Sequence, residues 1–195
     1  MSDVDLVSRA RQGDSAAFGE LVDRHRTAVY RAALAALGSQ ADAEDATQDA
    51  FLLAYRRLDS FRGEASFKTW LLRIAWRQAI NRRRSLTRVW RRMIEPNWRK
   101  DEEEHAAMME NAEAAGPTPE QAAVQHQLRR DIRAAIRALS PTLRDALLLA
   151  QSGDYSYEEI GAMLGSPVGT IKWRVSQARR VVRQQLRKRG YGERE

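Results

Sequence analysis

Hydrophobic positions recur every three or four residues along most of the chain, which is the spacing of amphipathic helices. The pattern predicts a first helix from Asp14, whose carboxylate can cap it, to about Leu37, with Gly38 ending it. Its apolar positions fall on one face: Phe18, Leu21, Val22, Val29, Ala32 and Ala33.

Two more helices are predicted in the first half. Ser39 can cap a helix over about residues 40–58, and Gly63 then interrupts the pattern. Ser66 can cap a third helix, which starts at Phe67 and runs to about Arg84.

The segment 86–117 has weak periodicity and no clear apolar face. It begins basic, turns acidic at residues 101–104 and ends in Ala-Ala-Gly-Pro, so we interpret it as a linker, extended or only partly helical. The sequence therefore predicts an all-α chain of two small helical domains, residues 1–85 and 118–190, joined by a flexible linker over 86–117.

The second domain begins with a cap, a first-turn proline and a capping-box partner, Thr118, Pro119 and Gln121. The helix that follows has one apolar face, formed by Leu128, Ile132, Ile136 and Leu139. Ser140 and Pro141 start another helix, which ends at Gly153.

A helix-turn-helix is predicted after that. Ser156 and Glu159 form a capping box for a short helix, which Gly165-Ser166-Pro167 ends. A longer basic helix then runs from about Val168 to Arg187, and a short helix, a tight turn and a basic helix are typical of DNA-binding domains.

The long basic helix has two faces. Its inward positions are Ile171, Val175, Ala178 and Val182, at helical spacing. Trp173 and Arg180 fall on the opposite face, flanked by Lys172, Ser176 and Gln177, side chains that can contact base edges or phosphates in a major groove.

Charge is distributed in blocks. The net charge of +7 divides into −4 over residues 1–55, +11 over 56–100, −7 over 101–121 and +7 over 122–195. Scattered arginines on solvated helix faces do not explain a 45-residue block at +11, whereas two surfaces for a polyanion do.

Composition narrows the function classes. The chain has no cysteine, and His25, His105 and His126 lack ligand spacing, so we expect neither a metal nor another cofactor. The N-terminus lacks the apolar stretch of a secretory signal and no run of about 18 apolar residues occurs, so we expect a cytoplasmic protein without membrane insertion.

Residues 42–75 read DAEDATQDAFLLAYRRLDSFRGEASFKTWLLRIA and closely resemble the second conserved region of the extracytoplasmic-function sigma factors of bacterial RNA polymerase. Residues 169–179, GTIKWRVSQAR, are similar to the family's fourth region. The resemblance covers roughly residues 5–85 and 118–187 and leaves out the predicted linker.

The resemblance implies a transcription initiation factor, not an enzyme, whose first domain binds the clamp helices of the polymerase largest subunit. An acidic patch with an apolar anchor suits that basic partner, and its residues are Asp42, Glu44, Asp45, Gln48, Asp49 and Phe51. Helix capping near Ser39 explains Asp42 but leaves Gln48 and Asp49 unexplained.

The resemblance also implies that the first domain recognises and melts the minus-ten promoter element. Aromatic and basic side chains can stack unpaired bases and hold phosphates, and the candidates are Phe61, Arg62, Phe67, Trp70, Arg73, Trp76, Arg77, Asn81 and Arg84. Trp70 is as consistent with a core role as with a DNA role.

By the same resemblance, the second domain reads the minus-thirty-five element and contacts the flap of the second-largest polymerase subunit. The candidates for base or phosphate contact are Thr170, Lys172, Trp173, Arg174, Ser176, Gln177 and Arg180. Three positions depart from the family pattern: Arg77 and Asn81 stand where the family often has asparagine and aspartate, and Trp173 stands where it often has a small polar residue. Base preference is therefore expected to differ.

The sequence does not favour two other function classes, a stand-alone regulator and a nucleic-acid enzyme. A helix-turn-helix regulator that binds duplex DNA unaided needs a dimer surface or a sensor domain, and the sequence shows neither. A nucleic-acid enzyme needs spaced metal-binding carboxylates, a nucleophile with its base or a glycine-rich phosphate loop, which are not seen. Members of the resembled class are usually held by an anti-sigma factor, so we expect such a partner; the linker could instead take part in regulation.

Overall fold

The structure, a computed structural model, describes the backbone of residues 1–93 and 119–191 and the side chains of residues 1–86 and 123–191. This part of the chain is helical and contains no strand, which confirms the predicted all-α class. Its elements are α1 (Asp3–Arg11), α2 (Ser15–Leu37), α3 (Gln40–Arg56), the 3₁₀ turn η1 (Leu58–Ser60), α4 (Phe67–Met93), α6 (Pro119–Arg137), α7 (Pro141–Gln151), α8 (Tyr157–Leu164) and α9 (Val168–Lys188).

Local capping sets most of the helix boundaries. The Asp14 carboxylate accepts a hydrogen bond from the backbone N–H of Ala17 at 3.1 Å, and Gly38 ends α2 with φ at 73°. Ser39 caps α3 through the N–H of Asp42 at 3.3 Å. The predicted capping box of Ser156 and Glu159 opens α8. These boundaries could be predicted because each cap depends on residues within one turn.

Helix α1 was not predicted. It begins with a capping box between Ser2 and Asp5, and Leu6, Val7 and Ala10 are buried. The spacing of these three residues is helical, but the stretch is only nine residues long and polar on its other sides. It packs against α2, so a tertiary contact stabilises it.

Helix α4 is longer than the sequence predicts and extends into the segment that was interpreted as an extended or only partly helical linker. The helix continues to Met93, and the proposed domain boundary at residue 85 therefore falls inside it. Arginine and leucine are strong helix formers, and a helix that is already nucleated can continue without new apolar contacts. The rest of the predicted linker, 94–117, lies outside the described residues. Helix α3 ends at Arg56, slightly before the predicted residue 58.

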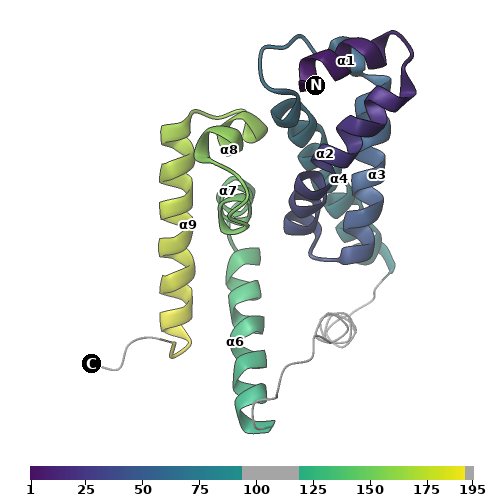
Figure 1. The fold of residues 1–195 in the computed structure, drawn as a ribbon. Helices are drawn as coiled ribbons and strands as arrows, with labels where there is room; N and C mark the ends of the chain where they lie inside the picture. The colour runs from purple at the N-terminus through teal and green to yellow at the C-terminus, as the bar shows by residue number, and fades with distance from the viewer. Residues whose placement is uncertain (94–118, 192–195) are drawn as a thin grey trace.

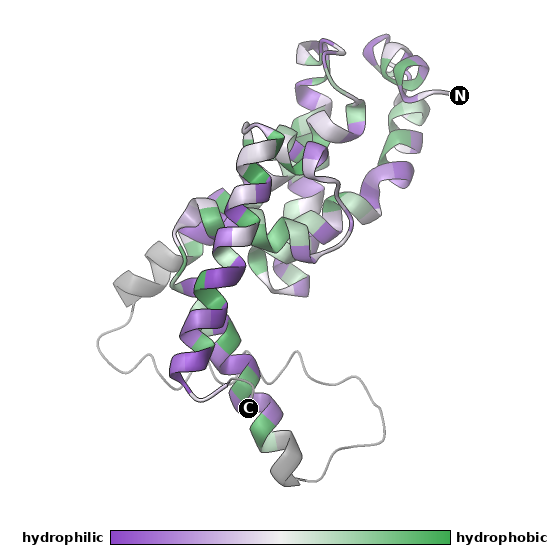
Figure 2. Ribbon diagram, turned by 90° about the vertical axis from the view of Figure 1, so that its left-hand side faces the viewer, coloured by the Kyte–Doolittle hydropathy of each residue, from purple (hydrophilic) through white to green (hydrophobic). Residues whose placement is uncertain are grey.

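The described helices form two groups that pack against each other. Helices α2, α3 and α4 contact one another in the N-terminal group, and α7, α8 and α9 in the C-terminal group, where α6 also lies along α9 (Figure 1). Contacts of α8 with α4 and of α7 with α2 join the groups. Hydrophobic and hydrophilic residues alternate along these helices (Figure 2), as expected when each helix buries one face.

One apolar core is continuous across this contact. It includes Val29 and Leu72 from the N-terminal group and Leu149, Tyr155 and Ile160 from the C-terminal group, all of them buried. Burial of apolar surface stabilises by about 25 cal/mol per Å², so this shared core holds the two groups together.

The helix-turn-helix depends on a close backbone approach at Gly161. A Cβ added there would lie 2.7 Å from the carbonyl oxygen of Ser166, and the N–H of Ser166 donates to the Gly161 carbonyl at 2.9 Å. Gly165, with φ at 61°, makes the turn between them. Only glycine at position 161 therefore lets the turn fold back onto α8.

Replacing Gly161 with alanine is expected to destabilise the chain by about 1–3 kcal/mol, because the new methyl group overlaps backbone that cannot move freely. Gly169→Ala is the matched control, since a Cβ at that helical position meets nothing within 4 Å. It should leave stability unchanged or raise it by up to about 1 kcal/mol. Urea unfolding of both variants tests this, and equal effects would contradict the close approach.

Candidate nucleic-acid interface

The acidic patch predicted for polymerase binding lies on the outer side of α3. Glu44, Asp45, Gln48 and Asp49 are exposed, whereas Asp42 is half-buried. Helix α3 thus presents three carboxylates and one amide to solvent within about two turns.

Phe51 does not fit its predicted role as an apolar anchor for a partner. Its side chain is 7% exposed and belongs to the core. Leu52 and Tyr55 are the exposed apolar residues of α3, at 58% and 46%. A helix turns by 100° per residue, so the next position along points outward when Phe51 points inward.

Arg82 of α4 bridges two of the predicted polymerase-binding acids. Its Nη2 lies 2.9 Å from Asp42 Oδ1 and 2.8 Å from Asp45 Oδ2, and its Nε lies 3.0 Å from Asp42 Oδ1. Burial lowers the pKa of the guanidinium, but the hydrogen bonds to both carboxylates outweigh burial and the pKa is raised. Arg82 therefore fixes α3 to α4 next to the acidic patch.

The residues predicted for the minus-ten element divide into exposed and buried sets. Arg77, Asn81 and Arg84 lie exposed on one side of α4, with Trp70 and Arg73 half-buried beside them. This row of five is called the α4 outer face below.

Phe67 and Trp76 are buried at 2% and 3% exposure, so neither side chain is placed for the direct DNA contact predicted for it. Helix α4 packs against α2, α3 and α8, which leaves a narrower free face than the helical pattern suggested.

An aromatic cluster supports the loop before α4. The ring centroids of Phe61, Phe67 and Trp70 are 5.4–5.7 Å apart, and Arg62 beside them is exposed. Arg11 holds the loop by donating to the Leu58 carbonyl at 2.9 Å and also to the carbonyl of Phe61. Sequence reasoning missed Arg11 because it comes from the unpredicted helix α1.

The helix predicted to enter a major groove presents a mixed polar face. Lys172, Trp173, Ser176 and Arg180 are exposed on α9, while Ile171, Val175 and Ala178 are buried against the core. Thr170 and Gln177 are half-buried at its edge.

Arg174 is set apart from the other candidates of α9. It is half-buried, and its Nη1 donates to Ser166 Oγ at 2.9 Å. In this structure Arg174 therefore stabilises the turn between α8 and α9.

Among the described side chains, three ion pairs join the two groups of helices. Lys68 Nζ lies 2.8 Å from Glu159 Oε1, Arg83 Nη2 lies 3.0 Å from Asp145 Oδ1, and Arg31 pairs with Asp154. In each pair the cation comes from the N-terminal group and the carboxylate from the C-terminal group.

Hydrogen bonds of Glu159 and Tyr155 also stabilise the contact between the two groups. Burial tends to raise the pKa of Glu159, but hydrogen bonds from Lys68 and from the Ser156 backbone outweigh it, so the pKa is lowered and the carboxylate is charged at neutral pH. Tyr155 is 8% exposed, and burial raises the pKa of its hydroxyl, which donates to the Ala28 carbonyl at 2.6 Å.

Arg73 belongs to both the α4 outer face and the contact between the groups. Its Nε donates to the carbonyl of Ala162 in α8 at 2.8 Å. One cation of the predicted minus-ten set is thus held by the helix-turn-helix domain.

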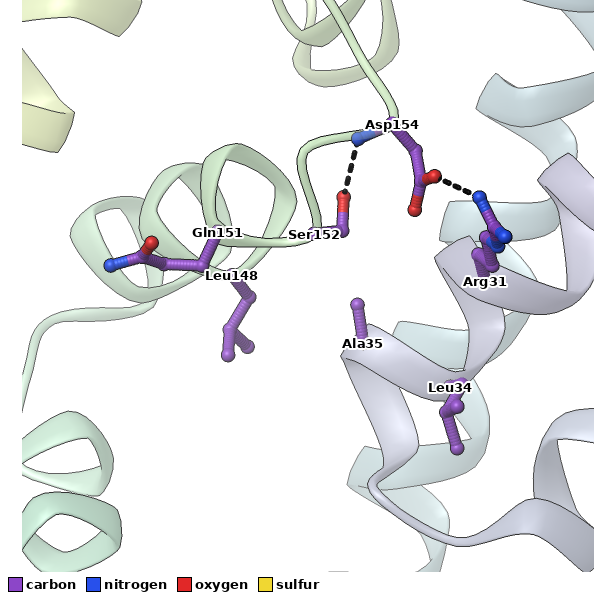
Figure 3. A pocket seen from close by; sticks show the side chains of 7 residues that line it. All are labelled: Arg31, Leu34, Ala35, Leu148, Gln151, Ser152 and Asp154. Atoms are coloured by element: carbon purple, nitrogen blue, oxygen red, sulfur yellow. Dashed lines mark hydrogen bonds and ion pairs between the residues drawn. The ribbon is translucent and has the colours of Figure 1, made fainter.

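A hollow of about 530 Å³ lies beside the Arg31–Asp154 pair, between α2 and α7. Leu34 and Ala35 from α2 and Leu148 from α7 project toward it, and Gln151 and Ser152 lie at the end of α7 (Figure 3). The shared core therefore leaves an open apolar groove at this edge.

Comparison with known proteins decides the family. Residues 21–89 match the model of sigma-70 region 2, and residues 129–181 match that of sigma-70 region 4. The chain is 34% identical to the ECF RNA polymerase sigma factor SigW of Bacillus subtilis (strain 168), over 93% of this chain and 95% of that one. It is 37% identical to the ECF RNA polymerase sigma-E factor of Escherichia coli (strain K12), over 93% of each.

The chain belongs to the ECF sigma factors. It is thus a transcription initiation factor that binds core RNA polymerase and recognises and melts promoter DNA.

Solved structures share the architecture of this sigma factor. CnrH, solved in complex with the cytosolic domain of CnrY, matches with a TM-score of 0.62 and 26% identity, over 96% of this chain and 99% of that one. The sigma factor RpoE of Bartonella quintana, solved with the anti-sigma factor NepR, matches in fold with a TM-score of 0.56 and 24% identity, over 87% and 96%.

Neither a membrane span nor a metal site is found within the described residues. No helix there is both long and apolar enough to span a bilayer, and no group of three or more His, Cys, Asp or Glu side chains is placed to hold a metal ion.

Reversing two cations of the ion pairs should open the sigma factor. Arg31→Asp with Lys68→Glu replaces two attractions by repulsions, each worth about 0.2–1 kcal/mol at such partly exposed positions, so the open population should rise severalfold. Small-angle scattering at low salt should show a larger radius of gyration.

The pair exchange Arg31→Asp with Asp154→Arg is the matched control, because it restores attraction at one site and should keep the chain compact. An unchanged radius in the double reversal, with folding intact by circular dichroism, would contradict the role of these pairs.

Proposed function

We propose that this sigma factor divides its contacts between three surfaces: α3 docks on polymerase, the α4 outer face takes the minus-ten element and α9 takes the minus-thirty-five element. One observation carries this assignment. The exposed side of α3 is acidic, whereas the exposed sides of α4 and α9 are basic. Opposite charge suits a basic protein helix in the first case and nucleic acid in the others.

Docking through α3 combines charge with apolar contact. The partner is proposed to be the clamp helices of the largest polymerase subunit, which would face Glu44, Asp45 and Asp49. Leu52 and Tyr55 stand beside these acids and replace Phe51 as the proposed apolar contacts. Exposed apolar side chains within a charged rim are typical of protein interfaces.

The α4 outer face is proposed to hold the melted minus-ten strand. Arg77 and Arg84 can meet phosphates, Asn81 can meet a base edge, and the half-buried Trp70 can stack an unpaired base. The aromatic cluster under the 58–66 loop gives that base an apolar floor, and Arg62 lies at its rim. Phe61, Phe67 and Trp76 then act by shaping the site, since they are buried.

Promoter opening is proposed to require separation of the two helical groups. Arg73 donates its Nε–H to the Ala162 carbonyl, which directs the guanidinium toward α8 and restricts its reach to a phosphate. Lys68, on the first turn of α4, is likewise held by Glu159. The closed arrangement therefore withholds two cations from DNA, while the exposed face of α9 stays accessible.

We also propose that an anti-sigma factor regulates this chain by holding the two groups of helices together. The sigma factor RpoE of Bartonella quintana, which shares this fold, was solved in complex with the anti-sigma factor NepR. The groove between α2 and α7 offers apolar residues next to a charged pair. A partner helix seated there would contact both groups and hold them closed. The protein is also proposed to be cytoplasmic, to act without catalysis of its own and to contact the polymerase flap through its second half.

The function is tested by transcription in vitro with core polymerase that lacks any sigma factor, over a library of genomic promoters. Starts that depend on the chain and cluster at shared upstream motifs are expected. The absence of initiation, with tight and specific duplex binding by the chain alone, would favour a stand-alone regulator.

The docking surface is tested with Leu52→Asp, which places a charge at the centre of the proposed contact. It should weaken binding to core polymerase at least about tenfold, as interface anchors do, with little loss of stability because the residue is exposed. Fluorescence titration measures the affinity.

Phe51→Ala is the contrasting variant and should cost about 3–5 kcal/mol of stability through a core cavity. If Leu52→Asp bound core polymerase as tightly as the wild type, the docking surface on α3 would be wrong.

A further inference from the structure

Trp173 is the feature of α9 that the fold does not explain. Its side chain is 62% exposed, on the side of the helix opposite Ile171, Val175 and Ala178. A large aromatic ring in that position contributes little to the core. It stands within the first two turns of the second helix of a helix-turn-helix, the part that reaches base edges in this motif.

The surroundings of Trp173 favour DNA over a protein partner. Lys172, Ser176 and Arg180 are exposed around it, and further arginines follow along the helix. Such a basic rim attracts phosphates and repels the basic faces of other DNA-binding proteins. Gly169 lies one turn earlier on the same side, and a Cβ there would meet nothing within 4 Å. The groove wall can therefore come close to the helix beside the indole.

The indole can contact only certain groups on the edge of a base. Apart from one N–H donor, its exposed surface is apolar carbon. In the major groove every base edge offers polar donors and acceptors, and the apolar group available for contact is the C5 methyl of thymine. An indole placed against that methyl distinguishes thymine from cytosine and from purines.

We propose that Trp173 selects thymine in the minus-thirty-five element by apolar contact with its C5 methyl group. This inference rests on the proposed role of α9 and adds the base that it selects. Lys172 and Arg180 supply the neighbouring polar and phosphate contacts.

The experiment replaces single thymines of the upstream element with deoxyuridine, which removes only the methyl group. The element is first located by mapping starts in the transcription assay, and binding of the holoenzyme to each duplex is then measured. The wild type should lose about fourfold in affinity at one or two positions, the value of one buried methyl group. Trp173→Ala should bind thymine and uracil templates equally, whereas Trp173→Phe should keep part of the discrimination.

Lys172→Ala is the matched control from the same helix turn. It should weaken both templates by the same factor and flatten the salt dependence of binding, as loss of a phosphate contact does. Circular dichroism checks that the variants are folded, which the exposure of both side chains favours.

Three outcomes would overturn the inference: a wild type indifferent to uracil at every position, an undiminished uracil penalty in Trp173→Ala, or weaker binding of Trp173→Ala to core polymerase without DNA. The last would make Trp173 a protein contact. Failure of the wild-type holoenzyme to bind any promoter template would instead count against the proposed function itself.

Discussion

The apolar contact of α2 and α4 with α7 and α8 is the interaction on which the rest of the structure depends. Its buried residues, among them Leu72, Leu149 and Ile160, belong to a single core, so each group buries apolar surface against the other. Apolar burial is non-directional, and it supplies most of the attraction. The ion pairs at its rim, which are directional, fix how the groups are aligned.

Helix α4 connects the parts of this arrangement. One side of it contributes to the core, another bonds the acidic helix α3 through Arg82, a third meets α8 through Arg73, and the remaining side is basic and free. A helix used on so many sides cannot rotate or shift without breaking several contacts. The acidic surface of α3 and the α4 outer face are therefore held at a fixed angle within the N-terminal group.

Sequence reasoning succeeded where structure is decided locally. The caps at Asp14, Ser39 and Ser156 depend on neighbours within one turn, and the helix-turn-helix follows from them. It failed where burial depends on distant helices. Trp76 was grouped with the side chains that contact DNA, yet the packing of α4 against its neighbours buries it.

The candidate site shows the same division. The exposed acids of α3 and the exposed cations of α4 and α9 could be identified from charge and spacing. Whether Phe51 or Leu52 is exposed could not be identified in this way. Adjacent residues of a helix point 100° apart, and only the packing of neighbouring helices decides which of the two is buried. The bonds of Arg82 and Arg11 also join residues about forty or more positions apart, which no local pattern reveals.

The three ion pairs between the groups all have the same orientation, and this affects the free energy of separating the groups. Arg31, Lys68 and Arg83 all come from the N-terminal group, and Asp145, Asp154 and Glu159 all come from the C-terminal group. Separation therefore uncovers positive charge on one body and negative charge on the other. A polyanion binds the first body more tightly once it is uncovered, so by mass action DNA itself acts as an effector of opening. Added salt weakens the ion pairs, which favours separation of the two groups. It also weakens the attraction of DNA for the N-terminal group, which disfavours separation.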